Sequence, residues 1–203
     1  LEALRTADVR ARVSGIVLER LFFFFSDVRA GDVLYRIDAA PYRAAYDSAR
    51  AAVARAEAAQ MEAKLREERA QSLIGKKMIS QQDFDSAMAN ARATQADVQA
   101  AKSALESARL NLDYATVRAP ISGRIGRALV TEGALVGQGE ATPLALIQQV
   151  NPLYVNFTQS STELLRLRKA LESGQLKTIG KQAEVQVVME DGTAYPHVGK
   201  LLF

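Results

Sequence analysis

Residues 84–115 read FDSAMANARATQADVQAAKSALESARLNLDYA. Apolar or small residues recur here at alternating steps of three and four, and only Thr94 interrupts them with a polar side chain. A 3.5-residue repeat is typical of a coiled-coil seam, so the stretch predicts a long helix packed along one face against another helix. The seam positions are Phe84, Ala87, Ala91, Thr94, Val98, Ala101, Leu105, Ala108, Leu112 and Ala115.

The partner helix precedes this stretch in the chain. Its seam positions follow the same steps and become less apolar towards the end: Tyr42, Tyr46, Ala49, Val53, Ala56, Gln60, Ala63, Glu67, Ala70 and Ile74. Residues 75–79 (GKKMI) break the pattern, and Ser80 followed by Asp83 predicts a new helix N-terminus. We therefore predict that residues 41–115 form an antiparallel helical hairpin, each arm roughly 50 Å long.

The composition limits what the rest of the chain can be. The 203 residues suffice for one to three small domains, and much of their apolar content is Ala, which buries little area. The net charge of +3 comes from interspersed acidic and basic residues, which argues against a nucleic-acid binder. Cys is absent, which excludes disulfides and thiol chemistry. No run approaches the ~20 apolar residues of a membrane span.

Short β-branched runs punctuated by Gly lie on both sides of the predicted hairpin, and the two sides resemble each other. With a shift of 108 residues, VRA at 9–11 aligns with VRA at 117–119, Ser14-Gly15 with Ser122-Gly123, and Gly31 with Gly139. The repeat predicts one small β domain made of two similar halves, with the hairpin inserted between them. The alternative is a chance similarity of two Gly-rich β-hairpins.

These halves resemble those of a biotinyl/lipoyl carrier domain, and such a domain split by an α-hairpin resembles the periplasmic adaptors of tripartite efflux pumps. Four stretches are very similar to the AcrA/MexA-like adaptors, the membrane fusion proteins of RND-type multidrug pumps. They are VRAPISGRIG at 117–126, EGALV at 132–136, NPLYV at 151–155 and STELLRLR at 161–168.

The resemblance implies an α+β fold that is elongated and multidomain. The helical coiled-coil hairpin (41–115) is inserted in a split lipoyl-like β domain (9–40 and 116–149). Residues 150–203 form an incomplete β-barrel domain with a short helix, to which residues 1–8 contribute a lead-in strand. The resemblance also implies that further barrel strands, a membrane-proximal domain and a lipid-bearing Cys belong to the protein outside this sequence.

The function that the resemblance implies is bridging an inner-membrane RND drug/proton antiporter to a TolC-like outer-membrane channel. Such adaptors are periplasmic, anchored by lipid to the inner membrane of a Gram-negative bacterium, and assemble into a ring, a hexamer by family analogy. An adaptor for an ABC exporter or a type I secretion system is the alternative. A lipoyl-type carrier is a third reading, but the turn that would bear its modified Lys is replaced by the hairpin, which leaves Lys76 and Lys77 at the far end.

Arg69, Leu73 and Ser80 have the spacing Arg-x3-Leu-x6-Ser, which is similar to the tip motif with which these adaptors meet the channel. Arg offers a fork of donors, Leu an apolar anchor and Ser a small donor and acceptor. The alternative is purely structural: Arg69 is solvated, Leu73 packs in the seam and Ser80 caps a helix.

No catalytic, cofactor or metal site is predicted, so we expect a protein that is not an enzyme. His197 is the only His and has no partner in the sequence for a metal site or a triad. Asp32 and Asp38 have no paired-carboxylate geometry that spacing can establish.

Four consecutive phenylalanines, Phe22 to Phe25, fit no strand with one solvated face. The repeat aligns Phe25 with Gly133, and the family has polar residues and Gly in this turn. We interpret the run as an alteration of a polar turn and assign it no binding role. The alternative is a native apolar patch for a neighbouring subunit.

Overall fold

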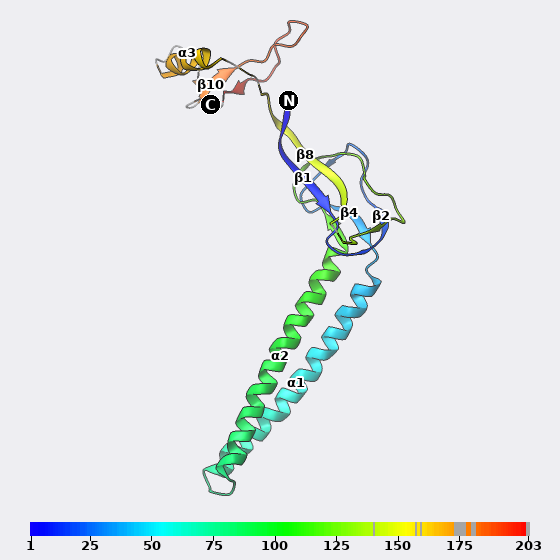
Figure 1. The fold of residues 1–203 in the computed structure, drawn as a ribbon, viewed down its shortest axis with the longest axis vertical. Coiled ribbons are helices and arrows are strands. Elements are labelled where there is room, and N and C mark those ends of the chain that lie inside the picture. Colours follow the sequence, from blue (N-terminus) through cyan, green and yellow to red (C-terminus); the bar gives the residue numbers. More distant parts are fainter. Residues whose placement is uncertain (140, 157, 159, 173–177, 180–181, 202–203) are drawn as a thin grey trace. The chain divides into compact units, whose positions relative to one another are not determined.

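The computed structural model describes residues 1–139, 141–156, 158, 160–172, 178–179 and 182–201 (Figure 1). The chain divides into two compact units, Leu1–Tyr154 and Val155–Phe203. The first unit contains the β domain and the hairpin, and the second contains a short helix and a small sheet.

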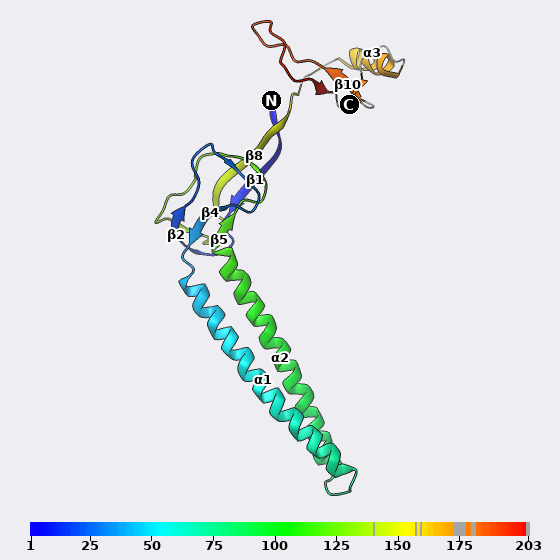
Figure 2. The ribbon, with the colours of Figure 1, turned by 180° about the vertical axis from the view of Figure 1, so that it is seen from behind.

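Helices α1 (Ala40–Ile74) and α2 (Gln81–Tyr114) lie side by side along their whole length, and the turn between them is at the end far from the sheets (Figures 1 and 2). Every seam position predicted from the spacing is buried or half-buried in both helices. Lys102 donates to Glu57 across the pair, with 2.9 Å between Nζ and Oε1. At the base, the Asp38 carboxylate accepts from the Ala40 amide at 3.0 Å, and Pro41 occupies the first turn of α1, where it is favourable.

The β domain consists of two four-stranded sheets, and each sheet combines strands from both sides of the hairpin. The strand orders are β1-β8-β6-β3 and β5-β4-β2-β7. The strands are β1 (Glu2–Arg10), β2 (Gly15–Arg20), β3 (Asp27–Val28), β4 (Val33–Ile37), β5 (Thr116–Arg118), β6 (Gly123–Ile125), β7 (Leu135–Val136) and β8 (Pro143–Tyr154).

The register of these strands repeats between the two halves. Gly15 pairs with Val136, and the equivalent Gly123 pairs with Val28. Likewise Val17 pairs with Ile37, and Ile125 pairs with Ile147. Gly15, Val28 and Val17 each lie 108 residues before their equivalents Gly123, Val136 and Ile125. Ile37 and Ile147 are 110 residues apart, so the second half contains two extra residues before β8. The predicted pairing of the two halves in one β domain is therefore present.

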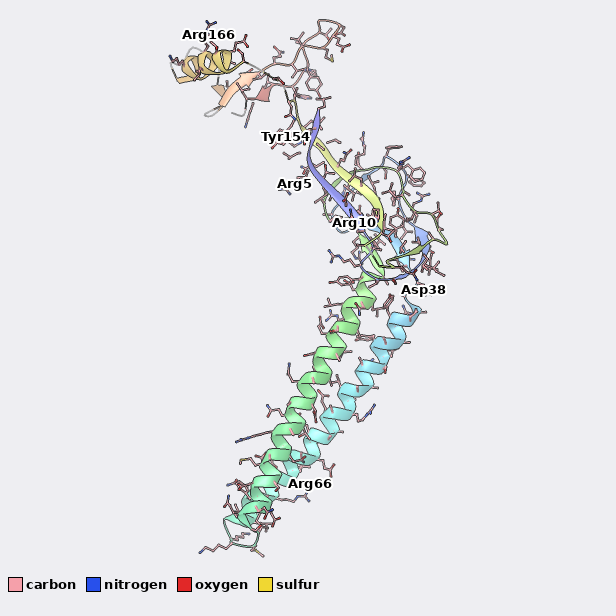
Figure 3. All side chains as sticks on the ribbon, in the orientation of Figure 1. Arg5, Arg10, Asp38, Arg66, Tyr154 and Arg166 are labelled. Carbon is pink, nitrogen blue, oxygen red and sulfur yellow. The ribbon has the colours of Figure 1, made fainter. Side chains whose placement is uncertain are left out.

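Both ends of the hairpin are attached to adjacent strands. Arg36 of β4 pairs with Thr116 of β5, and the Ile37 amide donates to the Ala115 carbonyl at 2.8 Å. Figure 3 labels Asp38 at this base and Arg66 towards the other end of the hairpin. The hairpin thus starts and finishes at one point of the β domain.

The core between the sheets is centred on Tyr35, which is completely buried. Its hydroxyl donates to the Leu144 carbonyl at 2.8 Å, and burial raises its pKa to about 12. The other fully buried large side chains come from both halves: Leu34, Ile37, Ile125, Leu144, Ile147, Val17 and Val136.

The phenylalanine run divides between core and surface. Phe22 is buried and meets the Tyr35 ring edge-on, with 5.3 Å between centroids. Phe23, Phe24 and Phe25 are exposed, and Phe25 has a φ of 60°. Its equivalent, Gly133, has a φ of 84°, so Phe25 occupies the turn position at which the other half has Gly.

The expected domain boundaries stay predictions. Strand β8 runs from Pro143 to Tyr154 without a break at residue 149, and β1 pairs with it from Glu2 to Arg10. Residues 1–8, expected to serve the barrel domain, thus lie in the first unit as part of β1.

In the second unit, α3 (Ser161–Glu172) begins directly after a capping box formed by Ser160 and Glu163. The Glu163 amide donates to the Ser160 hydroxyl at 3.3 Å, and the Ser160 amide donates to the Glu163 carboxylate at 3.4 Å. A three-stranded sheet in the order β11-β10-β9 completes the described part of this unit. Its strands are β9 (Thr178–Ile179), β10 (Gln182–Val185) and β11 (Gly199–Lys200).

Candidate functional site

The hairpin tip is a compact turn held by backbone hydrogen bonds. The Leu73 carbonyl accepts from the amides of Lys76 at 3.1 Å and Met78 at 3.0 Å. Lys77 has a φ of 57°, which closes the turn. The side chains of Lys76, Lys77 and Met78 are all exposed, so the end of the hairpin presents two cations and one apolar group to solvent.

Ser80 is the N-cap of α2. Its hydroxyl accepts from the Asp83 amide at 3.1 Å and donates to the Asp83 carboxylate at 2.6 Å. The structural role predicted for Ser80 is therefore confirmed. The side chain is also exposed, so capping leaves it accessible to a partner.

Arg69 and Leu73 lie one turn apart on the last part of α1, on the same face. Arg69 is exposed, and its Nε donates to the Leu65 carbonyl at 3.1 Å, which uses one of the five N–H donors of its guanidinium. Leu73 is half-buried and stands beside the seam, whose positions here are Ala70 and Ile74. The tip can thus offer guanidinium donors, part of an apolar side chain and a hydroxyl, but their role in docking stays a prediction.

A concave region that the sequence did not predict lies at the base of the hairpin. It is an open groove of about 910 Å³ lined by equivalent segments of the two halves, 8–12 and 116–120. Arg118 donates to the Gly31 carbonyl at 3.1 Å, and its equivalent Arg10 donates to the Ala141 carbonyl at 3.3 Å. The repeated sequence VRA, at 9–11 and 117–119, is the feature from which this groove could have been predicted. Since both arginines bind turn carbonyls of this chain, we read the groove as structural.

The residues considered for catalysis have structural contacts. The Asp32 carboxylate accepts from the Arg29 amide at 2.8 Å, and the Asp38 carboxylate accepts from the Ala40 amide at 3.0 Å. His197 is exposed and lies edge-on to Tyr195. Within the described residues there is no cluster of His, Cys, Asp or Glu able to hold a metal ion. Among the described helices, none has the length and apolar character to span a membrane.

Comparison with known proteins identifies the family. The model for the RND MFP barrel-sandwich hybrid domain matches residues 5–148, and the model for the RND MFP β-barrel domain matches residues 152–203. The multidrug export protein AcrE of Escherichia coli K12 is 52% identical over 99% of this chain and 52% of its own length. The multidrug efflux pump subunit AcrA of the same organism is 50% identical over 99% of this chain and 51% of its own length.

A solved MacA–MexA chimera, which contains the Pseudomonas aeruginosa MexA α-hairpin domain, shares the fold. It has a TM-score of 0.59 at 24% identity, over 98% of this chain and 63% of that one. The chain spans about half the length of the curated relatives it matches. Because the family model for the β domain covers most of the sequence, the chain belongs to the membrane fusion proteins of the RND type.

Proposed function

We propose that the protein containing this chain is the periplasmic adaptor of an RND multidrug efflux pump. It connects an inner-membrane drug/proton antiporter to a TolC-like outer-membrane channel and assembles with further copies of itself into a ring. It acts by assembly and not by catalysis. It is held at the inner membrane of a Gram-negative cell by a lipid anchor outside this chain.

The observation that carries the proposal is the hairpin inserted in the β domain of an RND membrane fusion protein. Each helix of about 35 residues places the tip roughly 50 Å from the sheets. A projection of this length serves to reach a distant partner, because its seam is satisfied within the chain and its tip is exposed. The names of the relatives, a multidrug export protein and a multidrug efflux pump subunit, favour drug efflux over an ABC exporter or type I secretion.

The carrier alternative is disfavoured by the position of the only tip lysines. Lys76 and Lys77 belong to the turn between two long helices and not to a tight turn joining two strands of the β domain. An acyl group attached there would stand a hairpin's length from the sheets. An intact mass without an acyl adduct would remove this alternative.

We propose that the tip docks on the outer-membrane channel through Arg69, Leu73 and Ser80. Arg69→Asp and Ser80→Arg, made in the full-length protein, should leave the melting temperature within a few degrees because the end of a hairpin contributes little to global stability. Both should abolish cross-linking to the channel and restore drug sensitivity, because a few anchors carry most of a small interface's binding energy. Cross-linking to the pump should persist.

Two matched variants separate docking from helix stability. Ser80→Ala removes the cap and the docking hydroxyl but adds no bulk, so it should weaken channel cross-linking less than Ser80→Arg does. Arg66→Asp reverses an exposed charge three residues before Arg69 and breaks its ion pair with Glu62, so it should retain drug resistance. Full resistance and channel cross-linking in both Arg69→Asp and Ser80→Arg would contradict the tip assignment.

A further inference from the structure

The turn at the hairpin tip ends α1 with a Schellman motif. The Met78 amide donates to the Leu73 carbonyl at 3.0 Å, and the Lys77 amide donates to the Ile74 carbonyl at 3.0 Å. These two hydrogen bonds define the motif, and its left-handed residue is ordinarily Gly. In this chain the left-handed residue is Lys77, with a φ of 57°. Gly75, in the same turn, lies two residues earlier and has a helical φ of −61°.

Lys77 therefore has a backbone conformation that suits Gly better than Lys. A side chain at positive φ is strained because its Cβ approaches the following carbonyl oxygen. Strained residues persist where the surrounding structure holds them, and they cluster at functional sites. The Lys77 side chain is exposed and forms no hydrogen bond or ion pair with any described residue. What Lys77 supplies and Gly does not is a cation in the turn at the end of the hairpin.

The end of the hairpin is a cationic surface. Residues 69–82 contain three basic side chains and no acidic one. Lys76 and Lys77 belong to the turn itself, and Lys76 too forms no ion pair with a described residue. The nearest acidic residues in sequence are Glu68, nearly two helical turns before the end of α1, and Asp83, whose carboxylate is hydrogen-bonded to the N-cap of α2. A partner that approaches end-on therefore meets two unpaired cations first.

Met78 adds an apolar group beside these cations. Its side chain is 68% exposed, although it is large and apolar. Met adapts its shape to irregular surfaces, which suits it to a contact with a partner. The hydrogen bonds of the motif hold the backbone of the turn, so its exposed side chains extend from a defined base. We call Lys76, Lys77 and Met78 the turn triad.

We infer that the turn triad selects the partner of the tip, by docking on a protein surface of the outer-membrane channel that presents carboxylates around an apolar contact for Met78. The two lysines pair with the carboxylates, and a Gly at position 77 would lose one of these pairs. Attraction between opposite charges accelerates association and discriminates against partners without them. This inference rests on the proposed docking of the tip and adds the chemistry of the surface that the tip meets.

Zero-length cross-linking tests the contact directly. A carbodiimide joins a lysine Nζ to a carboxylate that touches it, which forms an amide while the reagent takes up the water released. The full-length protein, mixed with the channel purified with it from native membranes, should give a covalent adduct linked through Lys76 or Lys77, as located by peptide mapping. Lys76→Arg combined with Lys77→Arg keeps both charges but removes both amines. It should retain binding and lose this adduct, and an adduct of unchanged yield would overturn the inference.

Lys77→Gly separates docking from the stability of the turn, since the two effects have opposite signs. Gly removes the strain, so the protection of the Met78 amide against hydrogen exchange should stay equal or increase. The association rate with the channel should nevertheless fall several-fold at low ionic strength, and the difference should shrink in high salt, which screens the charges. Lys77→Arg should keep the parent's rate. An unchanged association rate for Lys77→Gly would overturn the inference.

Arg50→Gln is the control for the loss of one positive charge. Arg50 is exposed on α1 at roughly 40 Å from the turn, which is several times the Debye length of about 10 Å at 0.1 M salt. Its removal should leave the association rate unchanged, whereas Lys77→Gln should behave like Lys77→Gly. An equal decrease for Arg50→Gln and Lys77→Gln would show that net charge, and not the turn triad, sets the rate.

The outcomes also separate this inference from the proposed docking. If Arg69→Asp abolishes cross-linking to the channel but the turn-triad variants associate like the parent, the inference alone is wrong. If the parent forms no complex with the channel, the proposed docking is wrong as well. Binding to phosphatidylglycerol vesicles that depends on Lys76 and Lys77, without an adduct to the channel, would assign the lysines to an anionic lipid surface and would also overturn the inference.

Discussion

At the scale of single residues, the most informative position is Phe25. Side chains other than Gly are strained at positive φ, because Cβ approaches the following carbonyl oxygen. The equivalent turn of the other half has Gly133 there, and both turns are closed by the same hydrogen bond, Ser26 to Phe23 and Ala134 to Thr131, each at 3.2 Å. The two turns therefore have the same backbone conformation, but Phe25 places a strained side chain where the other half has Gly133.

We predict that Phe25→Gly stabilises the β domain by about 1 kcal/mol, since it removes the strain and an exposed ring. For a chain of this size that corresponds to an increase in melting temperature of about 2–4 °C. Differential scanning calorimetry measures the effect. Replacing Phe23 and Phe24 by polar residues as well should increase solubility.

Phe25→Ala is the matched control for strain. It removes the ring but keeps Cβ at a positive φ, so its melting temperature should stay well below that of Phe25→Gly. Equal stability of the two variants would show that exposed aromatic area, and not backbone strain, is what destabilises the turn.

Tyr35 predicts a dependence of stability on alkaline pH. Burial raises its pKa to about 12 in the folded chain, above the ordinary value of 10, so folding favours the neutral phenol. Its contribution to stability is complete below pH 10 and is lost as the pH rises towards 12. Tyr35→Phe should cost about 1 kcal/mol at neutral pH through the lost hydrogen bond to Leu144.

The stability difference between the parent chain and Tyr35→Phe should shrink between pH 10 and 12, as measured by urea unfolding. Tyr154→Phe is the control, because Tyr154 is 40% exposed and lies outside the core. A difference that stays constant up to about pH 12 would argue that the Tyr35 hydroxyl ionises without cost in the folded state.

At the scale of elements, the helices could be predicted closely and the sheets only in part. The seam follows from a local spacing, so Phe84 to Ala115 could be placed on one helix face from the spacing alone. Even Gln60 and Glu67, which break the apolar pattern, are half-buried at their seam positions. Ser80 could be predicted as a cap because capping uses neighbouring residues.

The sheets depend on contacts that spacing does not reveal. The repeat located two equivalent halves, but not that each sheet takes two strands from each half, because strand pairing joins residues distant in the chain. The two extra residues before β8 were also not predicted. At the tip, the sequence identified Arg69, Leu73 and Ser80, but not that Arg69 bonds to Leu65 or that Leu73 stands beside the seam.

At the scale of the whole chain, the insertion point makes the β domain independent of the hairpin. Among the described residues, Ala115 is the hairpin's only fully buried contribution to the β core, with Tyr42 and Tyr114 partly buried against it. We predict that replacing residues 41–115 by a short turn leaves a folded domain. Its circular dichroism should lose the signal of α1 and α2 and keep that of the strands and the short α3, and the β domain should unfold cooperatively.

The adjacent strands β4 and β5 explain this expectation, since a short turn can join neighbouring antiparallel strands. A variant that restores Ala115 after the turn is the comparison, and it should be the more stable of the two. A collapsed product that binds hydrophobic dyes and unfolds without cooperativity would show that the β core needs the helices.

The regular seam has a consequence for the reach of the tip. The seam pattern repeats every seven residues. The hairpin therefore keeps both its packing and its base intact only if each helix gains or loses seven residues at a time. Each such step moves the tip by about 10 Å. The distance between the β domain and the partner of the tip can therefore change only in steps of about 10 Å. A partner at a fixed distance selects a whole number of these units, and an unequal insertion in one arm would turn its apolar side chains towards solvent.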